Sequence, residues 1–216
     1  MQPAALQQWQ QRFCEWLKSQ KTADGAHDIN HIKRVVKTAR QLAEMEQADL
    51  AVVIPAAWLH DCVAVAKDDS RRAKASVLAA EKAGNLLQNW DYPDSHIPAI
   101  QHAIEAHSYS ANIPCQTLEA KIVQDADRMD AIGAIGVART VMVGTSLGNP
   151  LTHNEDPFCY HRKPDDKLAM VDHFYTKLLH LKDSFHTESA CQEANRRHQF
   201  MLDFLQQLES EVTGCE

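Results

Sequence analysis

An ionisable pair, His60-Asp61, directly follows the apolar stretch 50–59 of this sequence. A charged group near a buried helix is costly unless it is paired or bound to a metal ion, so the pair is a candidate site. The dipeptide alone carries little information, because it occurs twice in the chain, at 27–28 and at 60–61. A solvated helix end, with an aspartate that caps the next segment, is the simpler interpretation of the pair taken by itself.

Two further segments strengthen the case for chemistry. His31 begins a predicted helix whose apolar stripe runs along 32–42, and the acidic segment QDADRMD at 124–130 follows another apolar stretch. Two histidines and two aspartates from three helices would combine nitrogen and hard oxygen ligands. Such a set suits Mn²⁺, Fe²⁺, Co²⁺, Ni²⁺ or Zn²⁺, and suits Mg²⁺ less well. Spacing alone leaves open which of the three acids in 124–130 is the ligand.

Apolar residues recur with helical spacing along most of the chain, and no segment shows sustained strand alternation. We expect helices near 3–19, 30–46, 50–59, 72–90, 95–108, 117–127, 130–143, 166–182 and 187–212. The pattern predicts an all-α fold, an irregular bundle of about eight or nine helices.

The length of 216 residues predicts a single domain, 1–216. Glycines and prolines exclude a long helix over 144–164, so this segment is either a functional loop or a simple connection. The segment 187–216 is expected to hold a C-terminal helix. The amphipathic terminal helices would pack on the core or join two subunits, which leaves a monomer or a homodimer open.

The net charge of −7 argues against a nucleic acid polymer or an anionic membrane surface as partner, but allows a local pocket for a small phosphate. The chain shows neither a membrane-spanning apolar stretch nor a secretory leader, and we expect a cytoplasmic protein. The six cysteines form no CxxC pair, so neither a disulfide framework nor a thiolate zinc site is expected.

The order of His31, His60-Asp61 and Asp127 resembles the H…HD…D signature of HD-domain metal-dependent phosphohydrolases. Six longer segments resemble a single-domain bacterial branch of that superfamily, largely uncharacterised but related to a nucleotide pyrophosphohydrolase. These are AHDINHIKRV (26–35), AAWLHD (56–61), AIEAHSYS (103–110), EAKIVQDADRMDAIGAIGVAR (119–139), EDPF (155–158) and DHFYTKLLHL (172–181).

The resemblance implies a divalent metal ion, with Mn²⁺ favoured. Its implied ligands are His31, His60, Asp61 and Asp127. Asp61 is also expected to accept a proton from the attacking water, and His107 to act on a phosphate or a second metal ion. Supporting positions around the ligands are His27, Asp28 and Asp130.

Further contacts to the substrate are expected from basic and hydroxyl side chains. Arg72 and Ser76 lie in RRAKAS, which resembles an arginine-plus-serine stretch of the family, and Lys177 follows His173 by four residues. From the loop 144–164, Asp156 or His161 is a candidate to reach the substrate.

The resemblance implies hydrolysis of a small phosphorylated molecule, most specifically of a (deoxy)nucleoside triphosphate to the monophosphate and pyrophosphate. Cys-Val-Ala-Val after His60-Asp61 disfavours a (p)ppGpp hydrolase, and the absence of a GYP motif disfavours a cyclic-di-GMP phosphodiesterase. Two alternatives stay open: a 5′-nucleotidase-like phosphomonoesterase, and a non-catalytic regulatory module that binds metal or nucleotide.

Overall fold

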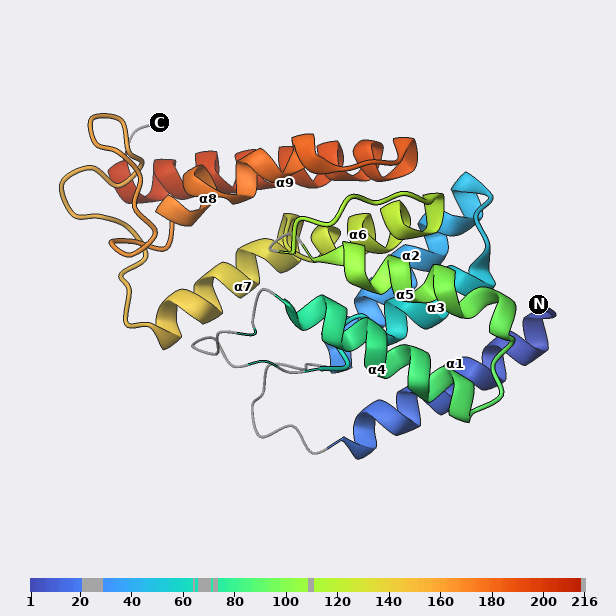
Figure 1. Ribbon diagram of the computed structural model, residues 1–216. Helices are drawn as coiled ribbons and strands as arrows, with labels where there is room; N and C mark the ends of the chain where they lie inside the picture. Colours follow the sequence, from blue (N-terminus) through green and yellow to red (C-terminus); the bar gives the residue numbers. More distant parts are fainter. Residues whose placement is uncertain (21–28, 64, 66–70, 72–73, 109–110, 215–216) are drawn as a thin grey trace. The chain divides into compact units, whose positions relative to one another are not determined.

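A computed structural model describes residues 1–20, 29–63, 65, 71, 74–108 and 111–214. Within these ranges the chain forms nine α-helices and two 3₁₀-helices and no strand, which confirms the all-α prediction (Figure 1). The helices divide into two compact units, Met1–Asp127 and Arg128–Glu216, which are described in turn. None of the described helices combines the length and apolar character needed to cross a bilayer.

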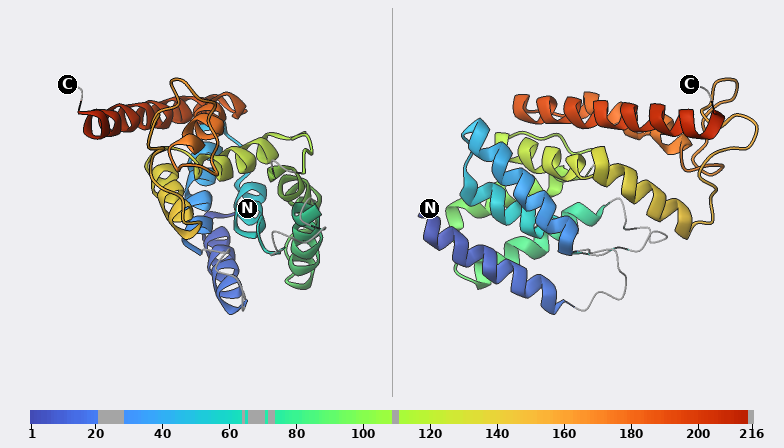
Figure 2. Two further views of the ribbon diagram at one scale, coloured as in Figure 1. Left: turned by 90° about the vertical axis from the view of Figure 1, so that its left-hand side faces the viewer. Right: turned by 180° about the vertical axis from the view of Figure 1, so that it is seen from behind.

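The first unit is organised around one apolar helix. Its helices are α1 (Pro3–Ser19), α2 (Ile29–Glu46), α3 (Leu50–Leu59), α4 (Ala75–Asn89), α5 (Ile97–His107) and α6 (Leu118–Met129), with a 3₁₀-turn η2 (Asp94–His96) before α5. Asp49 caps α3 by accepting the Ala51 N–H at 2.8 Å, and the helix tolerates Pro55 in its interior. Nearly every side chain of α3 is buried, because α1, α2 and α5 all pack against it (Figures 1 and 2). This helix therefore gives the residues that follow it, His60 and Asp61, a rigid base.

Cation–π contacts to tryptophan rings hold α1 against the rest of the first unit. The Arg12 guanidinium lies 5.4 Å from the Trp9 ring and 4.4 Å from the Trp90 ring, and the Lys82 ammonium lies 5.0 Å from the Trp16 ring. Such cation–π contacts contribute roughly 0.5–1 kcal/mol each at exposed positions. They hold the amphipathic N-terminal helix against this unit.

The second unit is built from α7 (Gly133–Ser146), α8 (Asp172–Thr176), the 3₁₀-helix η3 (Leu178–Ser184) and α9 (Glu188–Thr213). Helix α9 packs against α7 and η3. Gly133 begins α7 with φ +73°, a left-handed conformation that disfavours a Cβ atom. An alanine Cβ there would also lie 3.0 Å from the Arg197 side chain, which crosses the glycine to donate to the Met129 carbonyl at 2.7 Å.

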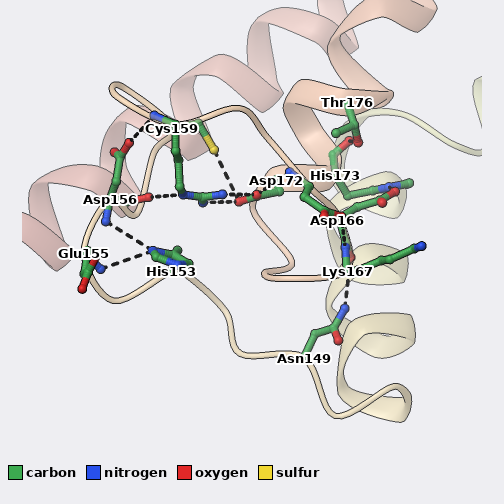
Figure 3. Close-up of polar contacts among 12 residues, drawn as sticks. Asn149, His153, Glu155, Asp156, Cys159, Asp166, Lys167, Asp172, His173 and Thr176 are labelled. Carbon is green, nitrogen blue, oxygen red and sulfur yellow. Dashed lines mark hydrogen bonds and ion pairs between the residues drawn. The ribbon is translucent and has the colours of Figure 1, made fainter.

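The helix predicted over 166–182 is wrong. The segment forms only the five-residue α8 and then η3. The cause is a buried ion pair. The Asp172 carboxylate accepts hydrogen bonds from both terminal nitrogens of Arg162, at 2.5 and 2.6 Å, and from the Asp165 N–H at 2.7 Å (Figure 3). Because Asp172 is fully buried and binds the preceding backbone, it fixes a turn where the pattern predicted helix.

The loop 144–164 is held by its own polar groups. Asp156 accepts hydrogen bonds from the backbone N–H groups of Tyr160, His161 and Arg162 at 2.9, 2.7 and 3.1 Å. The Asp156 carboxylate is thus occupied in shaping the loop rather than available to a substrate. His161 is exposed.

Candidate metal centre

Four elements of the first unit bring histidines and aspartates together. His31 comes from α2, His60 and Asp61 follow α3, His107 is the last residue of α5, and Asp127 lies on α6. Their ligand atoms form two groups that share His60: His31, His60 and Asp127, and His60, Asp61 and His107. Within each group the ligand atoms lie within 4.8 Å of one another. Residues separated by nearly 100 positions in the chain therefore converge as the sequence predicted.

The buried imidazoles of His60 and His107 are each oriented by a hydrogen bond to the backbone carbonyl three residues earlier. Nδ1 of His60 lies 2.8 Å from the Ala57 carbonyl oxygen, and Nδ1 of His107 lies 2.6 Å from that of Ile104. A carbonyl only accepts hydrogen bonds, so each Nδ1 carries the proton and donates it. In the neutral ring, Nε2 is then left with a lone pair that faces the cluster.

The Nε2 atom of His60 is buried and, among the described residues, has no hydrogen-bond partner. It lies 3.7 Å from Asp61 Oδ2 and 3.7 Å from Asp127 Oδ1. His31 Nε2 lies 3.3 Å from the same Asp127 oxygen, and His107 Nε2 lies 3.7 Å from Asp61 Oδ1. A buried lone pair facing two carboxylates is costly unless a cation lies among them, so these residues fit a divalent metal ion.

The electrostatics of the cluster keep His60 neutral and its carboxylates ionised. Burial lowers the pKa of His60, which is fully inaccessible to solvent. Desolvation inside the cluster opposes the ionisation of Asp61 and Asp127, although their side chains are 46% and 32% exposed, yet the neighbouring imidazoles hold both pKa values below the ordinary range. Metal ligands need a neutral imidazole and a charged carboxylate, which are the states favoured here.

Side chains outside the cluster hold its elements in place. Buried Gln124, three residues before Asp127 on α6, donates its Nε2 to the Ala106 carbonyl at 2.6 Å. It thereby ties α6 to the end of α5, next to His107. The i,i+3 spacing places Gln124 and Asp127 on one helical face and is a sequence signal for this role, although Gln124 is not among the predicted site residues.

A second set of bonds fixes the chain that follows Asp61. The Cys62 thiol donates to the Ala79 carbonyl at 3.4 Å, and Lys82 donates to the Cys62 carbonyl at 3.1 Å. Both partners belong to α4, so this helix and the residue after Asp61 are held together. Burial raises the pKa of the Cys62 thiol to about 12, which makes the cysteine a structural donor rather than a nucleophile.

Ser76 lies in the first turn of α4 and is only 2% exposed. Its hydroxyl is buried and has no hydrogen-bond partner among the described residues. The first turn of a helix also carries N–H groups that no carbonyl of the helix satisfies. The other predicted contact in this stretch, Arg72, lies outside the described residues, as do His27 and Asp28.

Two predicted residues lie in the second unit. Asp130 is buried and accepts a hydrogen bond from Arg139 at 2.9 Å, so its carboxylate is engaged in an ion pair. Lys177 is exposed, but it ends α8 with φ −141° and ψ −60° rather than continuing the helical face of His173. It lines a hollow beside α7.

Comparison with known proteins identifies a family. The family described as HD domain matches residues 28–132, which include His31, His60, Asp61, His107 and Asp127. The uncharacterised protein YpgQ of Bacillus subtilis is 34% identical over 207 residues, which cover 93% of this chain and 92% of the relative.

Solved structures extend the similarity to the fold. An HD-superfamily hydrolase from Bacillus thuringiensis is 32% identical with a TM-score of 0.75, and the alignment covers 97% of this chain and 100% of that one. Bacillus subtilis YpgQ in complex with ADP is 32% identical with a TM-score of 0.74, covering 95% and 96% of the two chains.

Proposed function

Since this chain belongs to the HD-domain family and its fold resembles that of an HD-superfamily hydrolase, we propose that it is a divalent-metal-dependent phosphohydrolase. One observation carries the proposal: the buried Nε2 atom of His60, which has no hydrogen-bond partner in the described part of the chain, lies 3.7 Å from carboxylate oxygens of both Asp61 and Asp127. The most specific form is a (deoxy)nucleoside triphosphate pyrophosphohydrolase that releases pyrophosphate.

We assign the metal ligands as His31, His60, Asp61 and Asp127. The mixture of imidazole nitrogen and carboxylate oxygen favours Mn²⁺, while Co²⁺, Ni²⁺, Fe²⁺, Zn²⁺ and Mg²⁺ are the other ions to test. When bound, such an ion lowers the pKa of a water molecule toward neutrality and polarises a phosphoryl oxygen.

Asp61 and His107 are the groups that would handle the proton and the phosphate. Asp61 is 46% exposed, so one carboxylate can face both the buried cluster and an entering substrate. Its Oδ atoms are assigned as the acceptor for the proton of the attacking water. Burial lowers the pKa of His107, but the contact with Asp61 outweighs burial and raises it. The protonated ring, held by the Ile104 carbonyl at Nδ1, would donate from Nε2 to a phosphate oxygen.

The first turn of α4 supports a phosphate contact. A helix N-terminus attracts anions through its free N–H groups, and here the buried Ser76 hydroxyl adds a donor that has no partner within the residues described. The bonds from Cys62 and Lys82 connect α4 to the residue after Asp61. We therefore assign Ser76 to the substrate phosphate.

The nucleotide assignment draws support from a neighbour. The structure of Bacillus subtilis YpgQ contains ADP, and that protein aligns with 95% of this chain. A nucleotide supplies the phosphates that a metal ion, His107 and Ser76 would bind.

The test is a product analysis. Purified protein is incubated with each metal ion and a panel of nucleoside mono-, di- and triphosphates, and pyrophosphate and orthophosphate are measured separately. We expect pyrophosphate with the monophosphate from triphosphates in Mn²⁺, and its loss in Asp61→Asn but not in the exposed control His180→Gln. Orthophosphate from monophosphates would instead select a 5′-nucleotidase-like enzyme. No turnover with any metal and nucleotide would overturn the enzyme and favour a binding module.

A further inference from the structure

The second unit contains a hollow of about 530 Å³ between α7 and the segment 149–178. We call it the α7 hollow. Its volume lies within the roughly 300–1,000 Å³ range of small-molecule sites. None of the metal-centre residues lines it, and of the residues expected to contact the substrate only Lys177 does.

One wall of the α7 hollow is apolar. Val143 of α7 and Leu147, which follows the helix as its C-cap, line it and are 51% and 66% exposed. Met170 and Leu178 complete this wall from the other side. The Met170 side chain lies against α7 at Gly144, where a Cβ atom would come within 2.3 Å of it.

The remaining wall carries positive charge. Lys167 and Lys177 both line the hollow, and within the residues that the structure describes neither forms an ion pair. Arg139 lines it as well, and its side chain stays 50% exposed although it pairs with Asp130.

The acid of the α7 hollow is already engaged. Asp166 lies 3.0 Å from Nδ1 of His173, and Figure 3 shows these two side chains against each other with Lys167 extending beside them. Two unpaired ammonium groups and an exposed guanidinium therefore gather around one apolar wall, in a chain whose net charge is −7. A local positive charge in a protein whose net charge is negative favours binding of an anionic ligand.

We propose that the α7 hollow binds a small organic phosphate, with its phosphate between Lys167, Lys177 and Arg139 and its apolar or aromatic body on Val143 and Leu147. Lysine binds phosphate as a compact charge and arginine adds a planar pair of donors, whereas the apolar wall selects against inorganic phosphate. Two sources share this chemistry: the substrate of the proposed hydrolase itself, or a second molecule that regulates it.

Calorimetric titration with AMP, in EDTA so that the metal centre does not contribute, tests the proposal. The double variant Lys167→Gln/Lys177→Gln should weaken AMP binding at least about tenfold, because two charge-assisted contacts are lost. The control Lys163→Gln removes an exposed lysine that does not line the hollow, and should bind AMP as the unaltered protein does. Leu147→Asn should weaken AMP more than inorganic phosphate.

The metal-centre variant Asp61→Asn separates this proposal from the proposed function. Its AMP affinity in EDTA should equal that of the unaltered protein, whether or not any nucleotide is hydrolysed. Unchanged AMP binding in the double lysine variant, or no binding of AMP at millimolar concentration, would overturn the proposal.

Steady-state kinetics of the metal-loaded protein then identify the source. If the ligand is the substrate, the double lysine variant raises KM and leaves kcat unchanged. If it is a second molecule, the single variant Lys167→Gln leaves KM and kcat unchanged, and AMP alters turnover in the unaltered protein but less in this variant.

Discussion

Nε2 of His60 and Oδ1 of Asp127 face each other across 3.7 Å inside the first unit. The His60 ring has its other nitrogen on the Ala57 carbonyl, so the proton of the neutral ring is on the far side. Burial keeps the pKa of His60 low, and nearby imidazoles keep that of Asp127 low. A lone pair on a fully buried ring therefore faces a charged carboxylate, which is the arrangement that a cation stabilises.

Replacement of His60 tests this relationship directly. His60→Gln should weaken Mn²⁺ binding by more than the roughly 10–100-fold loss typical of substitutions around metal ligands. Metal content after dialysis, measured by elemental analysis, provides the readout, with His180→Gln as the control because His180 lies exposed in the second unit. Equal metal content in both variants would contradict the assigned ligand set.

Ser76→Ala should affect stability and substrate affinity in opposite directions. A buried hydroxyl without a partner costs about 1–3 kcal/mol, so its removal should raise the melting temperature or leave it unchanged. The same change removes a phosphate donor and should raise KM for the nucleotide severalfold. Thermal unfolding and steady-state kinetics measure the two effects. A lower melting temperature with unaltered KM would show that Ser76 is only a packing residue.

Gln124→Leu should disturb His107 while leaving the core intact. The change removes the bond from Nε2 to the Ala106 carbonyl and should destabilise the fold by about 1–2 kcal/mol. A matched control exists on α5, where Gln101 donates in the same way to the Ala80 carbonyl at 3.2 Å. Gln101→Leu should cost similar stability.

The two glutamine variants should then differ in activity. Only Gln124→Leu is expected to lower kcat about tenfold or more and to shift the imidazole NMR signals of His107. Equal loss of kcat in both variants would assign Gln124 a purely structural role.

The sequence indicates which residues could form a metal centre, but it gives little sign of the side chains that hold them in place. His31, His60, Asp61 and Asp127 follow a recognisable order, and the HD-domain match spans them. The roles of these residues and of His107 stay predictions that the experiments above address. Gln124 was not predicted because its side chain bonds to a backbone carbonyl. Every residue has a backbone carbonyl, so the sequence does not mark the acceptor.

Helical periodicity predicted the long helices within a few residues but failed over 166–182. The pattern there is compatible with a helix, yet Asp172 is buried against Arg162 and the Asp165 N–H. An ion pair between residues ten positions apart across a loop leaves no periodic signal, so local propensity alone could not reveal it.

Two glycines with the same backbone conformation should respond differently to alanine. Gly133 and Gly148 have φ of +73° and +75°, so each alanine carries a left-handed cost of about 1–2 kcal/mol. At Gly148 nothing lies within 4 Å of the added Cβ, whereas at Gly133 the Arg197 stem lies 3.0 Å away. Gly133→Ala should therefore lose more stability in urea unfolding, because Arg197 must leave the Met129 carbonyl. Equal losses would show that Arg197 adapts freely.

The Arg162–Asp172 pair should make the second unit sensitive to acid. Burial raises the pKa of Asp172, but hydrogen bonds from Arg162, the Asp165 N–H and the Cys159 thiol outweigh this and hold the pKa below the ordinary 3.8. The charged carboxylate thus stabilises the fold above pH 3.8, and this contribution is lost as the pH falls through the lower folded-state pKa. Asp172→Asn should cost about 3 kcal/mol at pH 7. Urea unfolding measures the free energy of unfolding of Asp172→Asn and of the unaltered protein, and the difference between them should shrink as the pH falls below 3.8.

The control Asp183→Asn, at an exposed position, should have the same free energy of unfolding as the unaltered protein. A difference for Asp172→Asn that persists in acid would contradict an ionised Asp172.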